Sequence, residues 1–288
     1  MVQNNIPNPS AQKNPLASWF RQPKIYVKLP SGGKFYPHGS LDVSQNGDYA
    51  VYAMTAKDEL MFKTPDALLS GQSTVELIKS CIPAILDPWK MPSIDLDFAL
   101  IAIRIATYGA KMEINSQCPN CKEENAHDVE LDKWLDEFGN FIFPETINVD
   151  PLIVHIKPYT YQELTKTSIK TMEQQKIFDV INNDNLSDEE KLDKFGKSFI
   201  KLTELTVDII ADCIRQIDTP DNSVNDKKLI KEFIDNCPKD IFDQISAHVS
   251  SIKENISFVE KNAVCGNCDH HYDIPITMDQ SNFFGVRS

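Results

Sequence analysis

The sequence lacks the signatures of membrane proteins, secreted proteins and several enzyme classes. Its apolar runs are shorter than the roughly 20 residues of a membrane-spanning helix, and no secretory signal opens the chain. The metalloprotease pattern HExxH, the nucleophile elbow GxSxG and the dinucleotide-binding glycine pattern are all missing. We therefore expect a protein that is not an enzyme, with no catalytic residues, no small-molecule substrate and no contact with a membrane.

Positive charge is also scarce. The 29 Lys and Arg residues are outnumbered by 42 Asp and Glu residues, which gives a formal net charge of -13. So acidic a surface repels phosphate backbones, and this argues against nucleic acid as a partner. The 288 residues, 41% of them hydrophobic, are enough for a large core in one domain with an insertion or in two domains.

Two cysteine pairs far apart in the sequence are the most informative motif. Each has the spacing CxxC, which lets one tight turn present two thiols to a metal. The pairs are Cys118 with Cys121, and Cys265 with Cys268. Four sulfurs complete the closed tetrahedral shell of a structural zinc site, whose binding energy contributes to folding.

Two other interpretations of these cysteines remain open. Two disulfides or a redox pair would use the same spacing, but a redox CxxC opens a helix inside a βαβ unit, and neither pair does. His270 and His271 stand beside the second pair and offer substitute ligands, although we expect them on the surface of the outgoing strand. Cys81, Cys213 and Cys237 lie in helical patterns and suit small buried residues of a protein in a reducing cytoplasm.

Alternating segments flank both pairs. Lys111–Gln117 and Ala126–Leu131 are expected strands on either side of the first pair, and the same layout surrounds the second. Strand, turn and strand, twice over, is the layout of a zinc ribbon. We therefore predict a zinc ribbon that is split between residues 111–133 and 256–278.

The segment before the ribbon, residues 24–110, is predicted to be an α+β domain. Lys24–Leu29 and Asp48–Met54 read as strands. Ser93–Thr107 is a helix that is apolar on nearly every side, so it must be buried in the domain or covered by a partner.

The segment between the two ribbon halves, residues 134–255, is predicted to be a mainly helical insertion. Capping boxes at Thr160 with Glu163 and at Ser187 with Glu190 open two of its helices. The second helix continues as an apolar stripe at spacings of three and four. The stripe consists of Phe195, Phe199, Leu202, Leu205, Ile209, Cys213 and Ile217.

The rest of this insertion alternates between shorter elements. Helices are expected at about 227–236 and 239–254, and strands at 141–143 and 153–156. With the N-terminal domain and the ribbon, the predicted fold class is α+β.

The two ends of the chain carry aromatic residues in polar surroundings. Residues 1–23 are rich in Asn, Pro, Gln and Ser and are expected to form a flexible tail, in which Trp19 and Phe20 stand out. Such residues mark a docking point or pack back on their own domain. We interpret both ends as docking segments.

At the other end, residues 279–288 contain the adjacent Phe283 and Phe284. Two phenylalanines are seldom left in water, so they either fold back on the chain or insert into a neighbour.

Several short motifs together resemble one known family. They are Leu29–Tyr36, Met54–Glu59, Pro65–Gly71, the split cysteine pairs and Ser281–Phe284. In these motifs the chain is similar to the baseplate hub assembly proteins of T-even-like contractile-tailed bacteriophages (myoviruses). The similarity is best over the N-terminal domain and the ribbon, and in the insertion it rests on the pattern of elements only.

This resemblance implies a late viral protein that forms or assembles the central hub of a tail baseplate. It implies other hub and tail proteins as partners, and a location in the virion tail after assembly in the host cytoplasm. An acidic chain with aromatic ends agrees with a protein that works through contacts. The alternative is a cellular zinc-ribbon protein that binds nucleic acid or a transcription or translation complex, although Glu123, Glu124 and Asp269 beside the cysteines make a poor phosphate surface.

Overall fold

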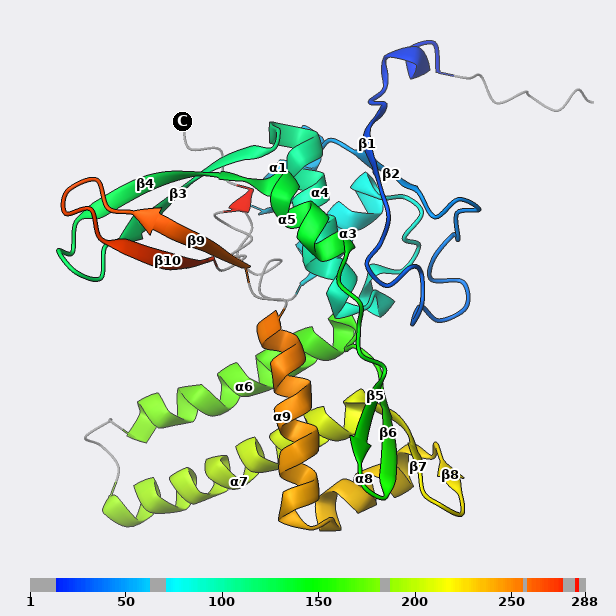
Figure 1. The fold of residues 1–288 in the computed structure, drawn as a ribbon, viewed down its shortest axis with the longest axis vertical. Helices are drawn as coiled ribbons and strands as arrows, with labels where there is room; N and C mark the ends of the chain where they lie inside the picture. The colour runs from blue at the N-terminus through cyan, green and yellow to red at the C-terminus, as the bar shows by residue number, and fades with distance from the viewer. Residues whose placement is uncertain (1–13, 63–70, 182–186, 256–257, 277–282, 285–288) are drawn as a thin grey trace, which may run out of the picture.

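The structure is a computed structural model that describes residues 14–62, 71–181, 187–255, 258–276 and 283–284. It is a mixed α+β fold with several small antiparallel sheets. Figure 1 shows two lobes, with a pair of β-hairpins projecting from one of them. We call these lobes the N-terminal lobe and the insertion lobe. Each lobe has its own hydrophobic cluster. Of the motifs behind the resemblance, residues 65–70 and 281–282 lie outside the described residues.

The N-terminal lobe is built around one central helix. Its elements are η1 (Ala17–Trp19), β1 (Pro23–Val27), β2 (Tyr49–Tyr52), α1 (Ala56–Phe62), α3 (Gln72–Cys81), η2 (Pro88–Lys90), α4 (Ser93–Tyr108) and α5 (Leu131–Gly139). Helix α4 has buried side chains around most of its circumference, as expected of a helix that is apolar on nearly every side. Strands β1 and β2 and helices α3 and α5 pack around it, so elements of the same chain cover it.

Two hairpins leave this lobe and point in the same direction (Figure 1). The first consists of β3 (Lys111–Gln117) and β4 (Glu124–Glu130), and the second of β9 (Phe258–Val264) and β10 (His271–Ile276). Both are antiparallel, and in both the cysteine pair occupies the connection between the strands. The predicted order of strand, cysteine turn and strand is therefore present twice.

Among the described residues, the insertion lobe combines four helices with a four-stranded sheet. The helices are α6 (Tyr161–Ile181), α7 (Asp188–Cys213), α8 (Lys227–Asn236) and α9 (Lys239–Asn255). The strands are β5 (Thr146–Val149), β6 (Leu152–Ile156), β7 (Ile214–Asp218) and β8 (Ser223–Val224), paired in that order. Both predicted capping boxes form at the starts of α6 and α7.

Two local predictions in this lobe are wrong. Residues 141–143 form no strand, because Pro144 follows them and cannot donate to a ladder; Phe141 and Phe143 instead pack against the insertion core. The stripe that begins at Phe195 does not stay helical to Ile217 either. The helix ends at Cys213, and Ile217 lies in β7 opposite Val154 of β6.

The far end of α7 also departs from a buried stripe. Ile210 belongs to the insertion core, whereas Phe199, three turns earlier, is 59% exposed. Figure 1 shows why: α6 and α7 run out together from the body as a helical hairpin. The apolar periodicity therefore predicts the helix correctly, but it does not predict where along the helix the core ends.

The lobes are joined along a short backbone seam. The Ser93 amide donates to the Tyr159 carbonyl at 2.7 Å, and the Tyr161 amide donates to the Met91 carbonyl at 2.9 Å. The Tyr161 ring stacks on Trp89 with centroids 5.3 Å apart. The start of α4 and the start of α6 are thereby fixed side by side.

Two acidic residues near the start of α4 lie in contrasting surroundings. Both oxygens of Asp95 accept from Ser31, one from the backbone amide and one from the hydroxyl. Burial still raises the pKa of Asp95 to about 6. Burial also raises the pKa of Asp97 to about 6, with no hydrogen bond to offset it. Asp97 is therefore a carboxylate that the fold holds at a cost near neutral pH.

This cost gives a prediction about pH. The folded chain binds a proton at Asp97 more tightly than the unfolded chain, so the contribution of Asp97 to stability falls as pH rises from about 4 to about 6. Asp97→Asn removes the charge, and we expect it to raise the free energy of unfolding at pH 7.5 by at most about 3 kcal/mol. At pH 4 the gain should fall below about 1 kcal/mol, because the folded chain is then protonated at Asp97. Urea unfolding of both chains at the two pH values measures the difference.

The control is Asp221→Asn, at an exposed acid in the turn between β7 and β8. It should change stability by less than about 0.5 kcal/mol at both pH values. A loss of stability in Asp97→Asn at pH 7.5 would contradict the prediction, because it would mean that the carboxylate has a stabilising partner.

Candidate metal centre

The four sulfurs predicted as metal ligands meet at the tips of the two hairpins. All four Sγ atoms of Cys118, Cys121, Cys265 and Cys268 lie within 4.8 Å of one another. The Sγ atoms of Cys118 and Cys268 are 3.8 Å apart, and those of Cys121 and Cys265 are 3.5 Å apart. Each short distance joins one hairpin to the other, so the cluster brings together two segments that are remote in sequence.

The two cysteine turns have the same backbone geometry. In the first, the Cys118 amide donates to the carbonyl of residue 123 and its carbonyl accepts from the amide of Lys122. In the second, the Cys265 amide donates to the carbonyl of residue 270 and its carbonyl accepts from the amide of Asp269. Lys122 and Asp269 both have positive φ, at 63° and 55°. Two stretches far apart in the sequence thus adopt the same type of turn, and each turn directs its two thiols toward the thiols of the other.

Asn125 ties the two turns together. Its Oδ1 accepts from the Gly266 amide at 2.8 Å, and its Nδ2 lies 3.5 Å from the Cys265 sulfur. Asn120 makes a similar contact, with its Nδ2 3.6 Å from the Cys268 sulfur. Amide donors of this kind orient and stabilise thiolate ligands.

Tyr272 joins the strands below the sulfurs. Its hydroxyl lies 2.7 Å from the Ser116 hydroxyl and 3.1 Å from His127 Nε2. Tyr272 belongs to β10, whereas Ser116 and His127 belong to β3 and β4. Sequence reasoning missed these contacts and those of Asn125, since nothing in the spacing of single polar residues shows which hairpin they face.

The electrostatics favour the thiolate form at the centre. Backbone amides of Asn267 and Cys268 point at the Cys265 sulfur, together with Cys121 and Asn125. The Asn267 amide is the largest of these influences, and together they lower the pKa of Cys265 to about 6. A deprotonated sulfur is the form that binds a metal.

The donor set fits a tetrahedral ion. A zinc ion with four sulfurs at about 2.3 Å has S···S edges of about 3.8 Å, close to the distances between the hairpins. A disulfide needs an S–S distance of about 2.05 Å, so the two short pairs are not disulfides. His270 and His271 are exposed and lie outside the cluster, as expected of surface residues.

The remaining cysteines are separate from this cluster. Cys81 and Cys213 are buried, and Cys237 is half-buried. Burial raises the pKa of Cys81 to about 11 and that of Cys213 to about 12. These thiols are neutral near pH 7 and behave as small apolar residues.

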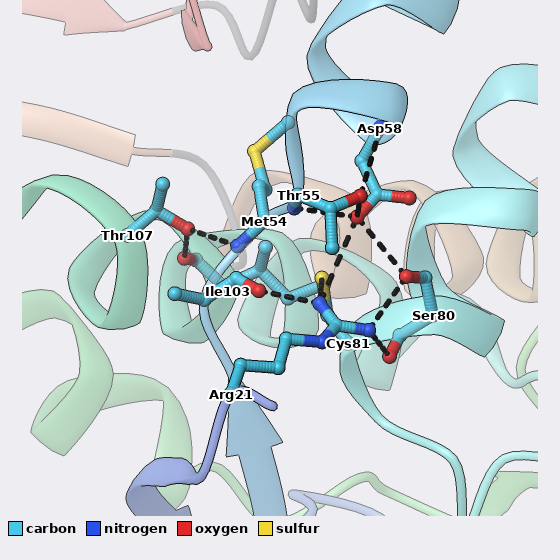
Figure 2. Close-up of polar contacts among 9 residues, drawn as sticks. Arg21, Met54, Thr55, Asp58, Ser80, Cys81, Ile103 and Thr107 are labelled. Atoms are coloured by element: carbon cyan, nitrogen blue, oxygen red, sulfur yellow. Dashed lines mark hydrogen bonds and ion pairs between the residues drawn. The ribbon is translucent and has the colours of Figure 1, made fainter. Parts of the chain in front are cut away.

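The N-terminal aromatic residues stand out from the surface. Trp19 is 85% exposed and Phe20 is 55% exposed. Arg21, directly after them, reaches into the lobe, as Figure 2 shows. Its guanidinium donates to the Ser80 carbonyl at 2.5 Å and to the Ser80 hydroxyl at 2.8 Å.

Further contacts secure Arg21. Its Nη1 donates to the Ala53 carbonyl and lies 3.7 Å from an Asp58 oxygen, and its guanidinium lies over the Tyr52 ring. Asp58 is in turn held by the Thr55 amide and hydroxyl (Figure 2). Arg21 therefore fixes the point from which Trp19 and Phe20 project.

The C-terminal aromatic residues lie inside the chain's own core. Phe283 and Phe284 are 5% and 6% exposed and belong to the N-terminal cluster. Arg104 donates to the Phe283 carbonyl at 2.5 Å, and Tyr108 donates to the Phe284 carbonyl at 3.2 Å. Of the two alternatives that the sequence left open, the structure has the one in which this end folds back.

A comparison with family models finds a match over residues 22–285 to the family described as T4 bacteriophage base plate protein. The match spans most of the chain, including both hairpins and both lobes, and the chain belongs to this family. Trp19 and Phe20 precede the matched residues, whereas Phe283 and Phe284 fall within them. No curated protein and no solved structure matches the chain.

Family membership supports a structural role in a T4-like phage tail, which is the resemblance seen in the sequence. It also implies interaction with other tail proteins and a location in the tail of the virion. Within the described part of the chain, no helix combines the length and the apolar character that crossing a membrane requires.

The burial of the C-terminal aromatic residues gives a second prediction. Phe283→Ala and Phe284→Ala should each lower the free energy of unfolding by about 3 kcal/mol, because each removes a buried ring from the N-terminal core. Trp19→Ala is the control and should change it by less than about 0.5 kcal/mol. Urea unfolding of the three variants measures this. If the two Phe variants are as stable as the native chain, these rings are not part of its core.

Proposed function

We propose that this baseplate protein forms or assembles the central hub of a contractile-tail baseplate, and that it acts through protein contacts rather than catalysis. The family match over residues 22–285 carries this proposal. The motifs shared with baseplate hub assembly proteins support the hub in particular. A strongly acidic chain agrees with partners that are proteins rather than nucleic acid.

The four cysteines hold one structural zinc ion and so complete a split zinc ribbon. What supports this is the meeting of four sulfurs at distances suited to one ion, on two turns of identical geometry. A shell of four cysteines leaves no open position, so the ion supplies structure rather than reactivity.

The second hairpin has the greatest need of such an ion. None of its described side chains belongs to either hydrophobic cluster. Its polar contacts with the first hairpin include those of Tyr272, Asn125 and the sulfurs, and Ile274 is buried outside both clusters. A metal supplies the stability that so small a unit cannot draw from a core of its own.

Trp19 and Phe20 dock on a neighbouring baseplate protein. Both side chains are exposed, and the contacts of Arg21 hold the chain directly after them. A segment that is already held in place loses less entropy on binding, which supports docking at this point. Buried aromatic anchors at interface centres contribute about 2 kcal/mol or more each. Phe283 and Phe284 are already buried in the chain, and docking through them would require them to leave that core.

A cellular zinc-ribbon protein that binds nucleic acid is the competing function. Glu123, Glu124 and Asp269 are exposed beside the cysteine turns, and carboxylates there repel phosphate. Salt-dependent binding of labelled DNA or RNA would favour this alternative.

The metal proposal predicts that both pairs bind the same ion. The purified chain should contain one equivalent of zinc, and Cys118→Ser and Cys265→Ser should each reduce it to less than about a tenth, because three ligands hold zinc poorly at a closed site. Elemental analysis after gel filtration measures the zinc. Hydrogen exchange should then speed up in β3–β4 and β9–β10 together.

The control is Cys237→Ser, at a half-buried cysteine outside the cluster, which should retain the full equivalent. A full equivalent of zinc in Cys118→Ser would show that the two pairs do not share a site.

The docking proposal predicts a loss of assembly without a loss of folding. In cells infected with a phage that lacks its own copy of this gene, a chain carrying Trp19→Ala and Phe20→Ala should yield few complete tails. Each anchor contributes about 2 kcal/mol or more to binding, so removing one should weaken binding by at least about 30-fold. Tail counts by electron microscopy measure assembly, and mass spectrometry of purified virions measures how much of the chain is incorporated.

Tyr26→Ala is the matched control, since Tyr26 is an exposed aromatic residue on β1 outside the docking segment. Normal tails with the double variant would reject docking through Trp19 and Phe20. Absence of the native chain from virions, together with its failure to capture hub proteins from infected cells, would reject the hub function itself.

A further inference from the structure

A cavity of about 620 Å³ lies between the two lobes. The start of α4 forms one wall, and residues 156–159 with α6, α7 and α9 form the others. Most of the wall is apolar, with contributions from Leu96, Phe143, Ile209 and Val249 among others. The volume lies in the range of about 300–1,000 Å³ that is typical of ligand pockets.

One carboxylate faces this apolar space. Asp97 lines the cavity from the second turn of α4. No side chain in the described part of the structure donates a hydrogen bond to it, and burial raises its pKa to about 6. Asp95, two residues earlier, differs because Ser31 satisfies both of its oxygens. Asp97 is thus a half-buried acid at the wall of an apolar cavity, with no counter-ion among the described residues.

Three other polar groups of the wall do not pair with Asp97. Lys157 pairs with Glu163 at 3.3 Å, and the Tyr159 hydroxyl donates to the Ile209 carbonyl at 2.7 Å. The Cys213 thiol is buried, with its pKa raised to about 12, and is neutral. None of these groups neutralises Asp97, and no cation in the described part of the structure is paired with it.

We propose that this cavity binds a cation carried on an apolar body, with an ammonium or guanidinium group paired to Asp97. An unpaired carboxylate in apolar surroundings is costly, and a cation with N–H donors removes that cost. The apolar body covers the remaining wall and releases its water. A neutral ligand of the same shape would gain only from covering the apolar wall, and Asp97 would repel an anion.

The same chemistry is available from two sources. A free amine has it, and so does a lysine or arginine side chain between apolar residues of another polypeptide. The proposal stands on the cavity and Asp97, and it does not depend on the hub function.

The test compares ligands of equal length that differ in charge. Isothermal titration of the full chain with n-octylamine, n-octanol and n-octanoate, each below its micelle concentration, should show one site. The amine should bind at least about tenfold more tightly than the alcohol, and the octanoate least. Asp97→Asn should bring the amine to the level of the alcohol, while Asp221→Asn should leave its advantage intact.

Two checks show whether the ligands bind in this cavity. Asp97→Asn is expected to remain folded, which circular dichroism checks. Ser246→Phe places a ring in the cavity wall and should weaken the binding of the amine and of the alcohol alike.

An acetylated, amidated pentapeptide with arginine between leucines, compared with its glutamine counterpart, then distinguishes a polypeptide from a free amine. Tighter binding of the arginine peptide than of octylamine identifies a polypeptide, and binding of octylamine alone identifies a free amine.

Equal binding of octylamine and octanol to the native chain would overturn the proposal. So would tight binding of octylamine to Asp97→Asn, because the cation would then be recognised elsewhere.

Discussion

The need to bury helix α4 on all sides is the constraint on which the N-terminal lobe depends. A 16-residue helix with apolar side chains around its axis is stable in water only if other elements surround it. Segments from both ends of the chain serve this purpose: β1 and β2 near the start, and Phe283 and Phe284 near the finish. Arg104 is a polar side chain in the middle of the α4 surface that this end covers. Its guanidinium lies over the Phe283 and Tyr108 rings and bonds the Phe283 carbonyl, so the returning end covers charge as well as apolar surface.

The C-terminal part of the chain returns to α4 through the second hairpin, whose described side chains belong to neither hydrophobic cluster. The chain leaves α4 through β3 and β4, builds the insertion lobe, and comes back through β9 and β10. Closing so long a loop carries an entropic cost that grows slowly with its length, and a clip at its base offsets that cost. The four sulfurs meet at the tips of the two hairpins, one on each side of this loop in the sequence.

Local signals in the sequence predicted the features that depend on local chemistry. Each CxxC pair determines its own turn, so the positions of the four sulfurs followed from spacing, and Ser187 with Glu190 forms its capping box from four consecutive residues. Features set by distant partners were not predictable in the same way. Ile217 has the spacing of the α7 stripe, but pairing with Val154 places it in a strand. The burial of Phe283 requires a surface on α4 that no pattern near residue 283 describes.

Asp97 illustrates the same limit and shows how the lobes are related. In sequence it is one more acid in an acidic chain, two residues from Asp95 at the start of a helix. Two residues along a helix turn a side chain by about 200°, so Asp95 faces its own lobe and Asp97 faces the other. The backbone seam at Ser93 and Tyr159 fixes the lobes directly beside this point. Seam and cavity are adjacent, so an occupant of the cavity touches α4 of one core together with α7 and α9 of the other. Its binding energy would therefore act on how firmly the insertion lobe is held to the N-terminal lobe, in addition to the stacking of Tyr161 on Trp89.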